Sequence, residues 1–223
     1  MPRSRAEEDA RSEIIRLVMH RTLSPGERVV EQALAEQMEL SRTPVRNALR
    51  ELIAEGFLER LDPKGARVPV LSPEDMKRLF QARGEAEGLA AREAAEAITE
   101  EELERLRVLF AREEAVYRSW SIDGFTEVNC AFHRGVAEGS HSPYLVRFVQ
   151  QCFWRSQVYV FFFDQFYLGY REYEGTRVPP GYDFSHEAHR GVLEALADRD
   201  APRARRLMEG HVRETYEALL RRE

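Results

Sequence analysis

Cysteine and long apolar runs are both scarce in this sequence, and each shortage excludes a class of protein. The two cysteines, Cys130 and Cys152, are too few for a disulfide framework or a four-cysteine zinc site. The most apolar stretch, residues 158–163, is far shorter than the roughly 20 residues that a membrane-spanning helix needs. The first residues are highly charged and lack the apolar segment of a signal peptide. The sequence therefore predicts a reduced cytoplasmic protein with no membrane partner.

An overall excess of basic residues is also absent, because the net charge is −6 at pH 7. The charges are unevenly distributed, however. Residues 1–71 carry 12 Lys and Arg against 12 Asp and Glu, whereas residues 72–223 carry the remaining 21 basic and 27 acidic residues. Within the neutral part, residues 41–50 contain three arginines and no acid. A neutral module with a local basic patch, joined to an acidic module, indicates a DNA-binding domain followed by a sensing or dimerising domain.

The first module, residues 1–71, has the pattern of a winged helix-turn-helix. Helices are expected at about residues 6–21, 31–38 and 41–55, and a β-hairpin at residues 57–60 and 67–70. Ser41 is the expected N-cap of the third helix, and Gly56 ends that helix. Three helices followed by a hairpin wing, with a short turn between the second and third helices, are typical of this fold.

The second module, residues 72–223, is predicted to be entirely α-helical. Helices are expected at about residues 74–97, 100–118, 122–139, 143–169, 183–197 and 201–222. Thr99 begins a capping-box sequence, and Gly139 ends a helix before Pro143 starts the next. Six helices of this length make an antiparallel bundle. The fold class is therefore mainly α, and the bundle is expected to bind an effector and to form a homodimer.

The third helix carries the most specific local pattern in the chain. Arg42, Thr43 and Arg46 fall on its polar side, opposite an apolar stripe. A recognition helix needs this division, because the stripe anchors the helix while polar residues near its N-terminus reach base edges in the major groove. Arginine can pair with guanine through two hydrogen bonds, and the hydroxyl of Thr43 or Ser41 can bind a phosphate. The alternative is that these arginines only solvate a surface helix.

A dense set of residues in this module points to a known family. The set is Leu34-Ala35-Glu36, Ser41-Arg42-Thr43-Pro44-Val45-Arg46, Ala48-Leu49, Leu52, Glu55-Gly56 and Gly65. Over about residues 10–70 it closely resembles the DNA-binding domain of GntR-family bacterial transcription regulators. The resemblance implies a double-stranded DNA operator, which a two-fold dimer would read as a short inverted repeat. It also implies that Arg42, Thr43 and Arg46 contact the operator and that Lys64 and Gly65, at the wing tip, enter or border the minor groove. Ser41 is added to these DNA-binding residues as a candidate phosphate contact.

Polar residues of the second module can be collected inside a helical bundle. Asn129 and His133 are four residues apart and therefore share a helical face. His189 and His211 come from the last two predicted helices. Three imidazoles and one amide oxygen from three helices are donors that suit a divalent transition metal. The alternative is that these are ordinary surface or core histidines.

The motifs around these residues also match a known family. Asn129-Cys-Ala-Phe-His133, Ser142-Pro-Tyr-Leu145, Ala188-His189-Arg190 and Ala204 to His211 resemble the FCD effector domain of the FadR subfamily, over about residues 73–220. The resemblance implies a metal held by Asn129, His133, His189 and His211, and zinc or nickel is the divalent metal that we expect there. Asn129 stands where the family usually has aspartate, so weaker metal binding with the same geometry is expected. Because ligating histidines must be deprotonated, metal affinity is expected to fall as the pH drops through roughly 6.5.

Two arginines are candidate effector-binding residues. Arg83 precedes Glu87 by four residues, and the family often has an arginine and a glutamate at these positions. A fixed guanidinium there could receive the carboxylate of a small organic acid through two hydrogen bonds. The alternative is an ion pair between Arg83 and Glu87 on the helix surface. Arg155, in a helix rich in aromatic residues, is the second candidate.

Taken together, these features predict a ligand-responsive transcription regulator, and most simply a repressor, rather than an enzyme. A metal-dependent enzyme built on the same histidines is the alternative. No activated nucleophile and no glycine-rich phosphate motif accompany the histidines, and a metal alone does not specify a reaction.

Overall fold

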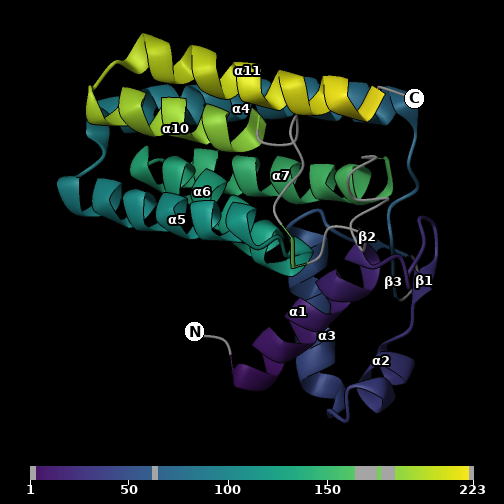
Figure 1. Ribbon diagram of the computed structural model, residues 1–223. Coiled ribbons are helices and arrows are strands. Elements are labelled where there is room, and N and C mark those ends of the chain that lie inside the picture. Colours follow the sequence, from purple (N-terminus) through teal and green to yellow (C-terminus); the bar gives the residue numbers. More distant parts are fainter. Residues whose placement is uncertain (1–3, 62–64, 164–174, 177–183, 221–223) are drawn as a thin grey trace.

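A small head and a larger helical body make up the computed structural model, which describes residues 4–61, 65–163, 175–176 and 184–220 (Figure 1). The elements of the head are α1 (Arg5–Met19), β1 (Arg28–Val29), α2 (Glu31–Gln37), α3 (Arg42–Ala54), β2 (Glu59–Arg60) and β3 (Ala66–Arg67). The described elements of the body are α4 (Pro73–Ala97), α5 (Glu100–Arg118), α6 (Ile122–Gly139), α7 (Pro143–Phe163), α10 (Phe184–Ala197) and α11 (Ala201–Leu220). The predicted fold class, mainly α with an N-terminal winged helix-turn-helix, is confirmed.

The sheet of the head has one strand more than the sequence pattern predicted. Its strands are antiparallel in the order β1-β3-β2, with Arg67 of β3 opposite both Arg28 and Glu59. The β2–β3 hairpin is the predicted wing. Strand β1 was not expected, because two residues offer no alternating pattern to detect.

Local capping explains several helix starts. Ser4 and Thr99 form capping boxes with Glu7 and Glu102, so that each side chain satisfies a backbone N–H at the start of α1 or α5. Helices α5 and α6 have the predicted bounds. The predicted helix at residues 143–169 is observed as α7, and its last six residues lie outside the described part of the chain.

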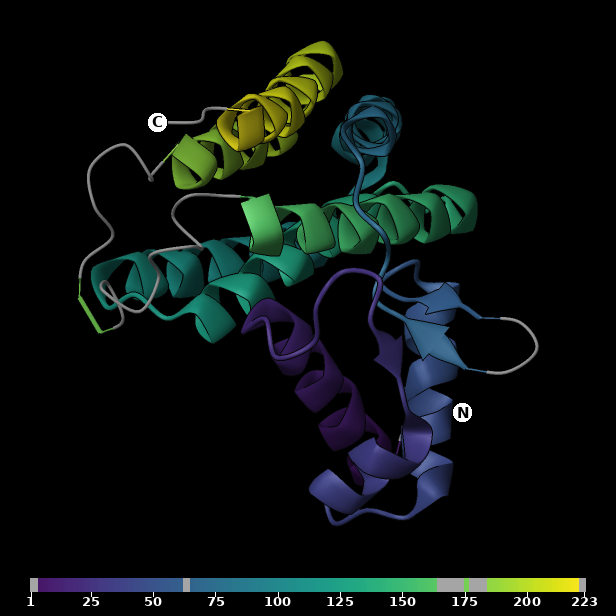
Figure 2. The ribbon, with the colours of Figure 1, turned by 90° about the vertical axis from the view of Figure 1, so that its right-hand side faces the viewer.

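The body helices are arranged in two groups. Helix α4 packs against α11, α7 and α6, and α5 packs against α6 and α10. The group α4, α10 and α11 lies on the side away from the head, whereas α5, α6 and α7 lie next to the head (Figures 1 and 2). None of the helices in the described ranges is long and apolar enough to cross a membrane.

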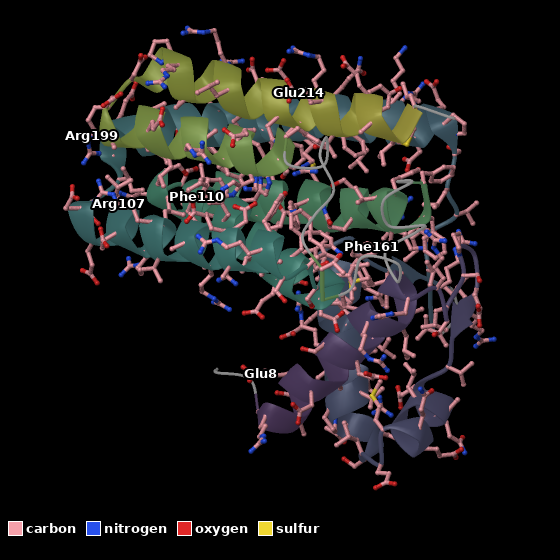
Figure 3. The ribbon with its side chains drawn as sticks, viewed as in Figure 1. Glu8, Arg107, Phe110, Phe161, Arg199 and Glu214 are labelled. Atoms are coloured by element: carbon pink, nitrogen blue, oxygen red, sulfur yellow. The ribbon has the colours of Figure 1, made fainter. Side chains whose placement is uncertain are left out.

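Helix α7 forms the junction between body and head. Phe161 lies where α7 meets the head (Figure 3), and its carbonyl oxygen accepts hydrogen bonds from Arg21 Nε at 3.0 Å and Nη2 at 2.8 Å. Gly56 follows α3 with a φ of +79°, and a Cβ there would lie 3.2 Å from the carbonyl oxygen of Gln151 in α7. Glycine is therefore required at this position both by the helix end, as predicted, and by the close approach of the body.

Candidate functional site

Helix α3 presents the predicted recognition residues to solvent. Arg42, Thr43 and Arg46 are exposed. The opposite stripe, which contains Val45, is buried in the head. Ser41 occupies the N-cap position of α3 in extended backbone, but its side chain makes no capping hydrogen bond. The exposed hydroxyls of Ser41 and Thr43 and both guanidinium groups therefore lie at the surface around the start of α3.

Glu31, the first residue of α2, contacts both recognition arginines and was not singled out by any sequence motif. Its Oε1 accepts hydrogen bonds from Arg42 Nε at 2.9 Å and from Arg46 Nη2 at 2.8 Å, and its Oε2 accepts one from Arg46 Nε at 3.0 Å. The hydrogen bond from Arg46 lowers the pKa of Glu31, and the same contact raises the pKa of Arg46. Because these residues belong to two different helices, helical periodicity gave no signal for the contact.

The wing is described only in part. Gly65 has a φ of +127°, which favours glycine. The side chain of Arg28 in β1 lies beside it, since a Cβ on Gly65 would be 3.5 Å from Arg28 Nε. Lys64, the other residue predicted at the wing tip, lies outside the described residues. The described wing thus brings a basic residue from an unpredicted strand next to Gly65.

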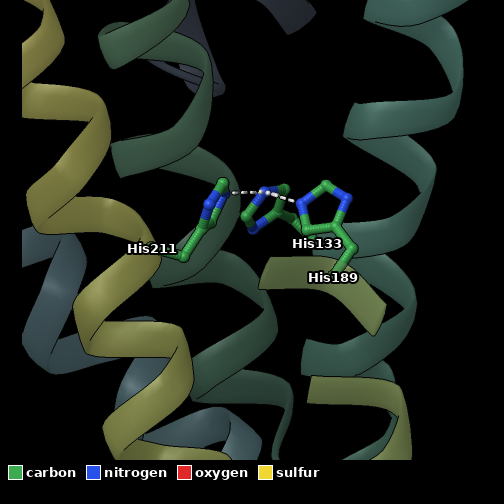
Figure 4. A group of neighbouring side chains, drawn as sticks. All are labelled: His133, His189 and His211. Carbon is green, nitrogen blue, oxygen red and sulfur yellow. Dashed lines mark hydrogen bonds between the residues drawn. The ribbon is translucent and has the colours of Figure 1, made fainter. Parts of the chain in front are cut away.

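Three histidines from three helices meet inside the body. His133 of α6 lies between His189 of α10 and His211 of α11 (Figure 4), and its Nε2 is 3.3 Å from the Nε2 of each. All three side chains are buried, and one potential ligand nitrogen from each lies within 4.8 Å of the others. The structure therefore brings together three of the four residues predicted as metal ligands.

Two buried carboxylates orient two of these rings. His133 Nδ1 lies 2.6 Å from Glu87 Oε2, and His189 Nδ1 lies 2.9 Å from Glu113 Oε2. Burial alone would raise the pKa of both carboxyls, but contacts with Arg83 and His133 beside Glu87, and with His189 and His186 beside Glu113, outweigh it and lower each pKa to about 2. An ionised carboxylate only accepts hydrogen bonds, so Nδ1 of each ring is the donor. A neutral ring with a protonated Nδ1 turns the lone pair of its Nε2 toward the centre of the cluster.

Burial also sets the protonation of the cluster. It lowers the pKa of His133 to about 4, against the opposing attraction of Glu87. It lowers the pKa of His211 well below the usual value, and the neighbouring histidines add to the effect. Both rings are therefore neutral at pH 7, which is the form that binds a metal.

Asn129 lies on α6 one turn before His133 and is also buried. Its Oδ1 and the Nδ1 of His211 are buried without a hydrogen-bond partner among the described residues. Such orphaned polar atoms are uncommon in folded proteins because each carries an uncompensated desolvation cost. The fourth predicted ligand thus has a free oxygen on the helix that carries His133.

Arg83 lies inside the body and not on its surface. Its Nε donates to Glu87 Oε1 at 2.6 Å, and its Nη1 donates to Ser156 Oγ of α7 at 3.0 Å. The alternative prediction, an ion pair between Arg83 and Glu87, is observed, but the pair is buried and not on the helix surface. The second oxygen of Glu87 contacts His133. Arg83 is therefore linked to the histidine cluster through one carboxylate.

Arg155, the second candidate effector residue, lies at the boundary between head and body. Its Nη1 donates to Glu59 Oε1 of β2 at 2.9 Å, and its Nη2 donates to Asp75 Oδ2 of α4 at 3.2 Å. The Tyr159 hydroxyl donates to the same Asp75 oxygen at 2.6 Å. These contacts join the wing to the first helix of the body.

Comparisons with known proteins agree with this two-part architecture. The family of bacterial regulatory proteins called gntR matches residues 6–68, and the FCD domain family matches residues 78–214. The Nta operon transcriptional regulator of Aminobacter aminovorans is 28% identical over 196 residues, which are 88% of this chain and 86% of that protein. The uncharacterized HTH-type transcriptional regulator YdhC of Bacillus subtilis (strain 168) is 29% identical over 135 residues, and this match spans only 60% of each chain.

A solved structure shows the same fold. E. coli McbR/YncC superposes with a TM-score of 0.74 at 23% identity, over 96% of this chain and 95% of that one. Both matched families and both sequence relatives are regulatory proteins, which confirms the prediction of a transcription regulator rather than an enzyme. The chain belongs to the GntR family of bacterial regulatory proteins, as a member whose second domain is an FCD domain.

Proposed function

We propose that this regulator is a homodimeric, ligand-responsive repressor that binds a short inverted repeat of DNA. Its body would bind a divalent metal, zinc or nickel, together with a small organic acid. The observation that carries the metal site is the convergence of three buried Nε2 atoms from three helices. The DNA-binding surface rests on Ser41, Arg42, Thr43 and Arg46 at the exposed start of α3, and on Gly65 and Lys64 of the wing.

The separations of the three imidazoles fit a metal ion. Zinc–nitrogen bonds of about 2.0–2.1 Å at tetrahedral angles place neighbouring ligand atoms about 3.3 Å apart. His133 Nε2 lies at 3.3 Å from the Nε2 of both His189 and His211. The Nδ1–H groups of His133 and His189 are engaged by carboxylates, so the Nε2 lone pairs of these two rings face each other, and a cation between them would remove their repulsion. Asn129 Oδ1, which is buried and unpartnered among the described residues, would complete the donor set.

The organic acid would bind next to this group. A bound divalent ion supplies a Lewis-acidic position that can accept an additional carboxylate oxygen. Arg83 supplies a second positive charge, and its field reaches both His133 and His211, whose pKa values it helps to lower. A small carboxylate is therefore the ligand class that the charges of this interior favour. Arg155 would contribute to binding of the organic acid from the boundary with the head, where its guanidinium group donates hydrogen bonds to Glu59 and Asp75.

Metal content of the purified protein tests the site. Wild type is expected to retain zinc or nickel in stoichiometric amount, and His133→Ala, His189→Ala and His211→Ala are each expected to lose it. His141→Ala is the matched control, because His141 is a half-exposed histidine that pairs with Glu102 outside the cluster. Equal metal content in all five proteins would leave the buried histidines as ordinary packing residues.

Selection from a random-sequence duplex pool tests the DNA-binding surface. Wild type is expected to enrich a short inverted repeat and to bind it as a dimer. Arg42→Ala and Arg46→Ala should each weaken that complex by about 1–3 kcal/mol and relax base preference, while Lys64→Ala should weaken all duplexes similarly. Arg105→Ala, on the surface of the body, is the control and should change nothing. A wild-type protein without any sequence preference would contradict the proposed function.

A further inference from the structure

One carboxylate holds both arginines of the recognition surface. The three hydrogen bonds from Arg42 and Arg46 to Glu31 all lie between 2.8 and 3.0 Å. The Glu31 side chain is 22% exposed, against 61% for Arg42 and 45% for Arg46. The acid is thus the inner member of the group, and the two guanidinium groups form its outer layer.

The contacts leave particular donors available on each arginine. Both guanidinium groups use Nε toward Glu31, and Arg46 also uses one hydrogen of Nη2. Within the described part of the chain, neither arginine makes another hydrogen bond. The terminal nitrogens of each group therefore remain as a fork, which is the arrangement that pairs with the O6 and N7 atoms of guanine.

Glu31 has no evident duty in holding α2 together. The N-cap of α2 is Val30, which makes no side-chain capping hydrogen bond, and the helix is anchored through the buried Leu34 and Ala35. A second acid on the same helix, Glu36, accepts a hydrogen bond from Gln32 at 3.0 Å and does not contact the arginines. Both views place α2 and the start of α3 on the side of the head away from the body (Figures 1 and 2).

We propose that Glu31 is a specificity-determining residue, which positions the Arg42 and Arg46 forks for base edges and keeps them from binding phosphates without regard to sequence. The inference rests on the proposed DNA-binding role of α3. It assigns Glu31 a positioning role, since the base contacts are those of the arginines.

Two physical effects follow from the position of Glu31. Free arginine side chains lose rotamer entropy when they bind, and a side chain that is already held loses less. A carboxylate beside the groove also repels the phosphate backbone, which weakens binding to every duplex alike. The repelled backbone lowers the affinity for all duplexes, and the held forks raise the ratio of specific to non-specific affinity.

The test compares Glu31→Gln with Glu36→Gln, which removes the same charge from the same helix. Each protein is titrated with the duplex that wild type selects from a random pool and with a scrambled duplex, at one fixed salt concentration. Both variants should bind the scrambled duplex more tightly than wild type does. Only Glu31→Gln should lower the ratio of specific to non-specific affinity, by about tenfold, because only there are the forks released. An unchanged melting temperature shows that the head remains folded.

A third variant separates contact from charge. Glu31→Asp keeps the charge, but its side chain is one methylene shorter and cannot hold both arginines. Its ratio of specific to non-specific affinity should therefore also fall. The proposal is overturned if the ratio of specific to non-specific affinity of Glu31→Gln lies within about twofold of the ratio of Glu36→Gln. It is also overturned if Glu31→Asp retains the wild-type ratio. A wild-type protein that selects no sequence would instead overturn the proposed function itself, before Glu31 is tested.

Discussion

At the scale of single residues, the chemistry of the interior depends on which nitrogen of each histidine is already engaged. Glu87 and Glu113 accept hydrogen bonds from the Nδ1–H groups of His133 and His189, and this leaves the Nε2 lone pairs of the two rings available to a metal. The histidines themselves were predictable, because Asn129 and His133 share one helical face and the family resemblance supplied the others. The two carboxylates were not predicted as their partners, because each comes from a different helix, at a sequence distance of 46 or 76 residues.

Asn129→Asp is expected to tighten metal binding by about tenfold, because it adds a negative charge beside a divalent ion. The same change should make the metal-free protein less stable, since a buried carboxylate without a partner is costly. Chelator competition measures the affinity, and thermal unfolding with and without metal measures the stability. Asn129→Leu is the matched control, because it removes the proposed ligand oxygen, and it should weaken metal binding. Equal affinity in the three proteins would remove Asn129 from the donor set.

The pH dependence of metal binding follows from burial. An exposed histidine site loses metal through about pH 6.5. Here burial lowers the pKa of His133 to about 4 and that of His211 well below its usual value, so protons compete with the metal only in more acid solution. Protonation of His133 and His211 is therefore expected to release the metal only well below pH 6.5, which is lower than the sequence alone indicated. Metal affinity measured in half-unit pH steps checks this, and a midpoint at about 6.5 would contradict it.

The lowered pKa of His133 also makes the stability of the metal-free protein depend on pH. The pKa of His133 is lower in the folded protein than in the unfolded chain, so the unfolded chain binds the proton first as the pH falls. The stability that the neutral ring contributes is full above about pH 6.5 and is lost as the pH falls from there through about 4.

At the scale of elements, the local signals predicted most of the helices. Thr99 caps α5 and Gly56 follows the end of α3, and both positions follow from local backbone chemistry alone. Strand β1 and the contacts of Arg155 could not be predicted, because both depend on segments that are distant in the sequence. The pair between Arg83 and Glu87 was foreseen from its spacing, but spacing does not tell whether a helix face is buried.

Helix α7 is the element that connects the interior site to the head. Ser156 accepts a hydrogen bond from Arg83 on the inner side, and the adjacent Arg155 contacts Glu59 of the wing. A double-mutant cycle of Arg155→Gln and Glu59→Gln should give a coupling of about 0.5–3 kcal/mol in urea unfolding, since the two side chains are in contact and partly buried. The control cycle of Arg78→Gln and Glu74→Gln, a strongly exposed (i, i+4) pair on α4, should give no more than about 0.5 kcal/mol. Equal coupling in the two cycles would mean that the bridge adds nothing to the junction.

At the scale of the whole molecule, head and body are parts of one core. Phe57 of the head and Trp154 of α7 belong to the same buried cluster, and their rings meet edge to face at 5.5 Å. Arg11 of α1 lies over the Trp154 ring at 5.0 Å and pairs with Glu55 at 2.7 Å. Trp154 also lines a cleft of about 610 Å³ between α1 and the helices α6 and α7. The Trp154 ring therefore joins helix α7 of the body to α1 and Phe57 of the head.

Wild type is accordingly expected to unfold in one cooperative calorimetric transition, and Trp154→Ala is expected to divide it into two. The truncation removes the contacts with Phe57 and Arg11 and should cost about 3–5 kcal/mol, most of it at the junction. Trp120→Ala is the matched control, because Trp120 is equally buried but packs against Tyr117 and Phe125 inside the body. It should lower the melting temperature and leave a single transition. A single transition in Trp154→Ala as well would show that the remaining contacts of α7 suffice to couple head and body, and that the ring is only one part of a redundant junction.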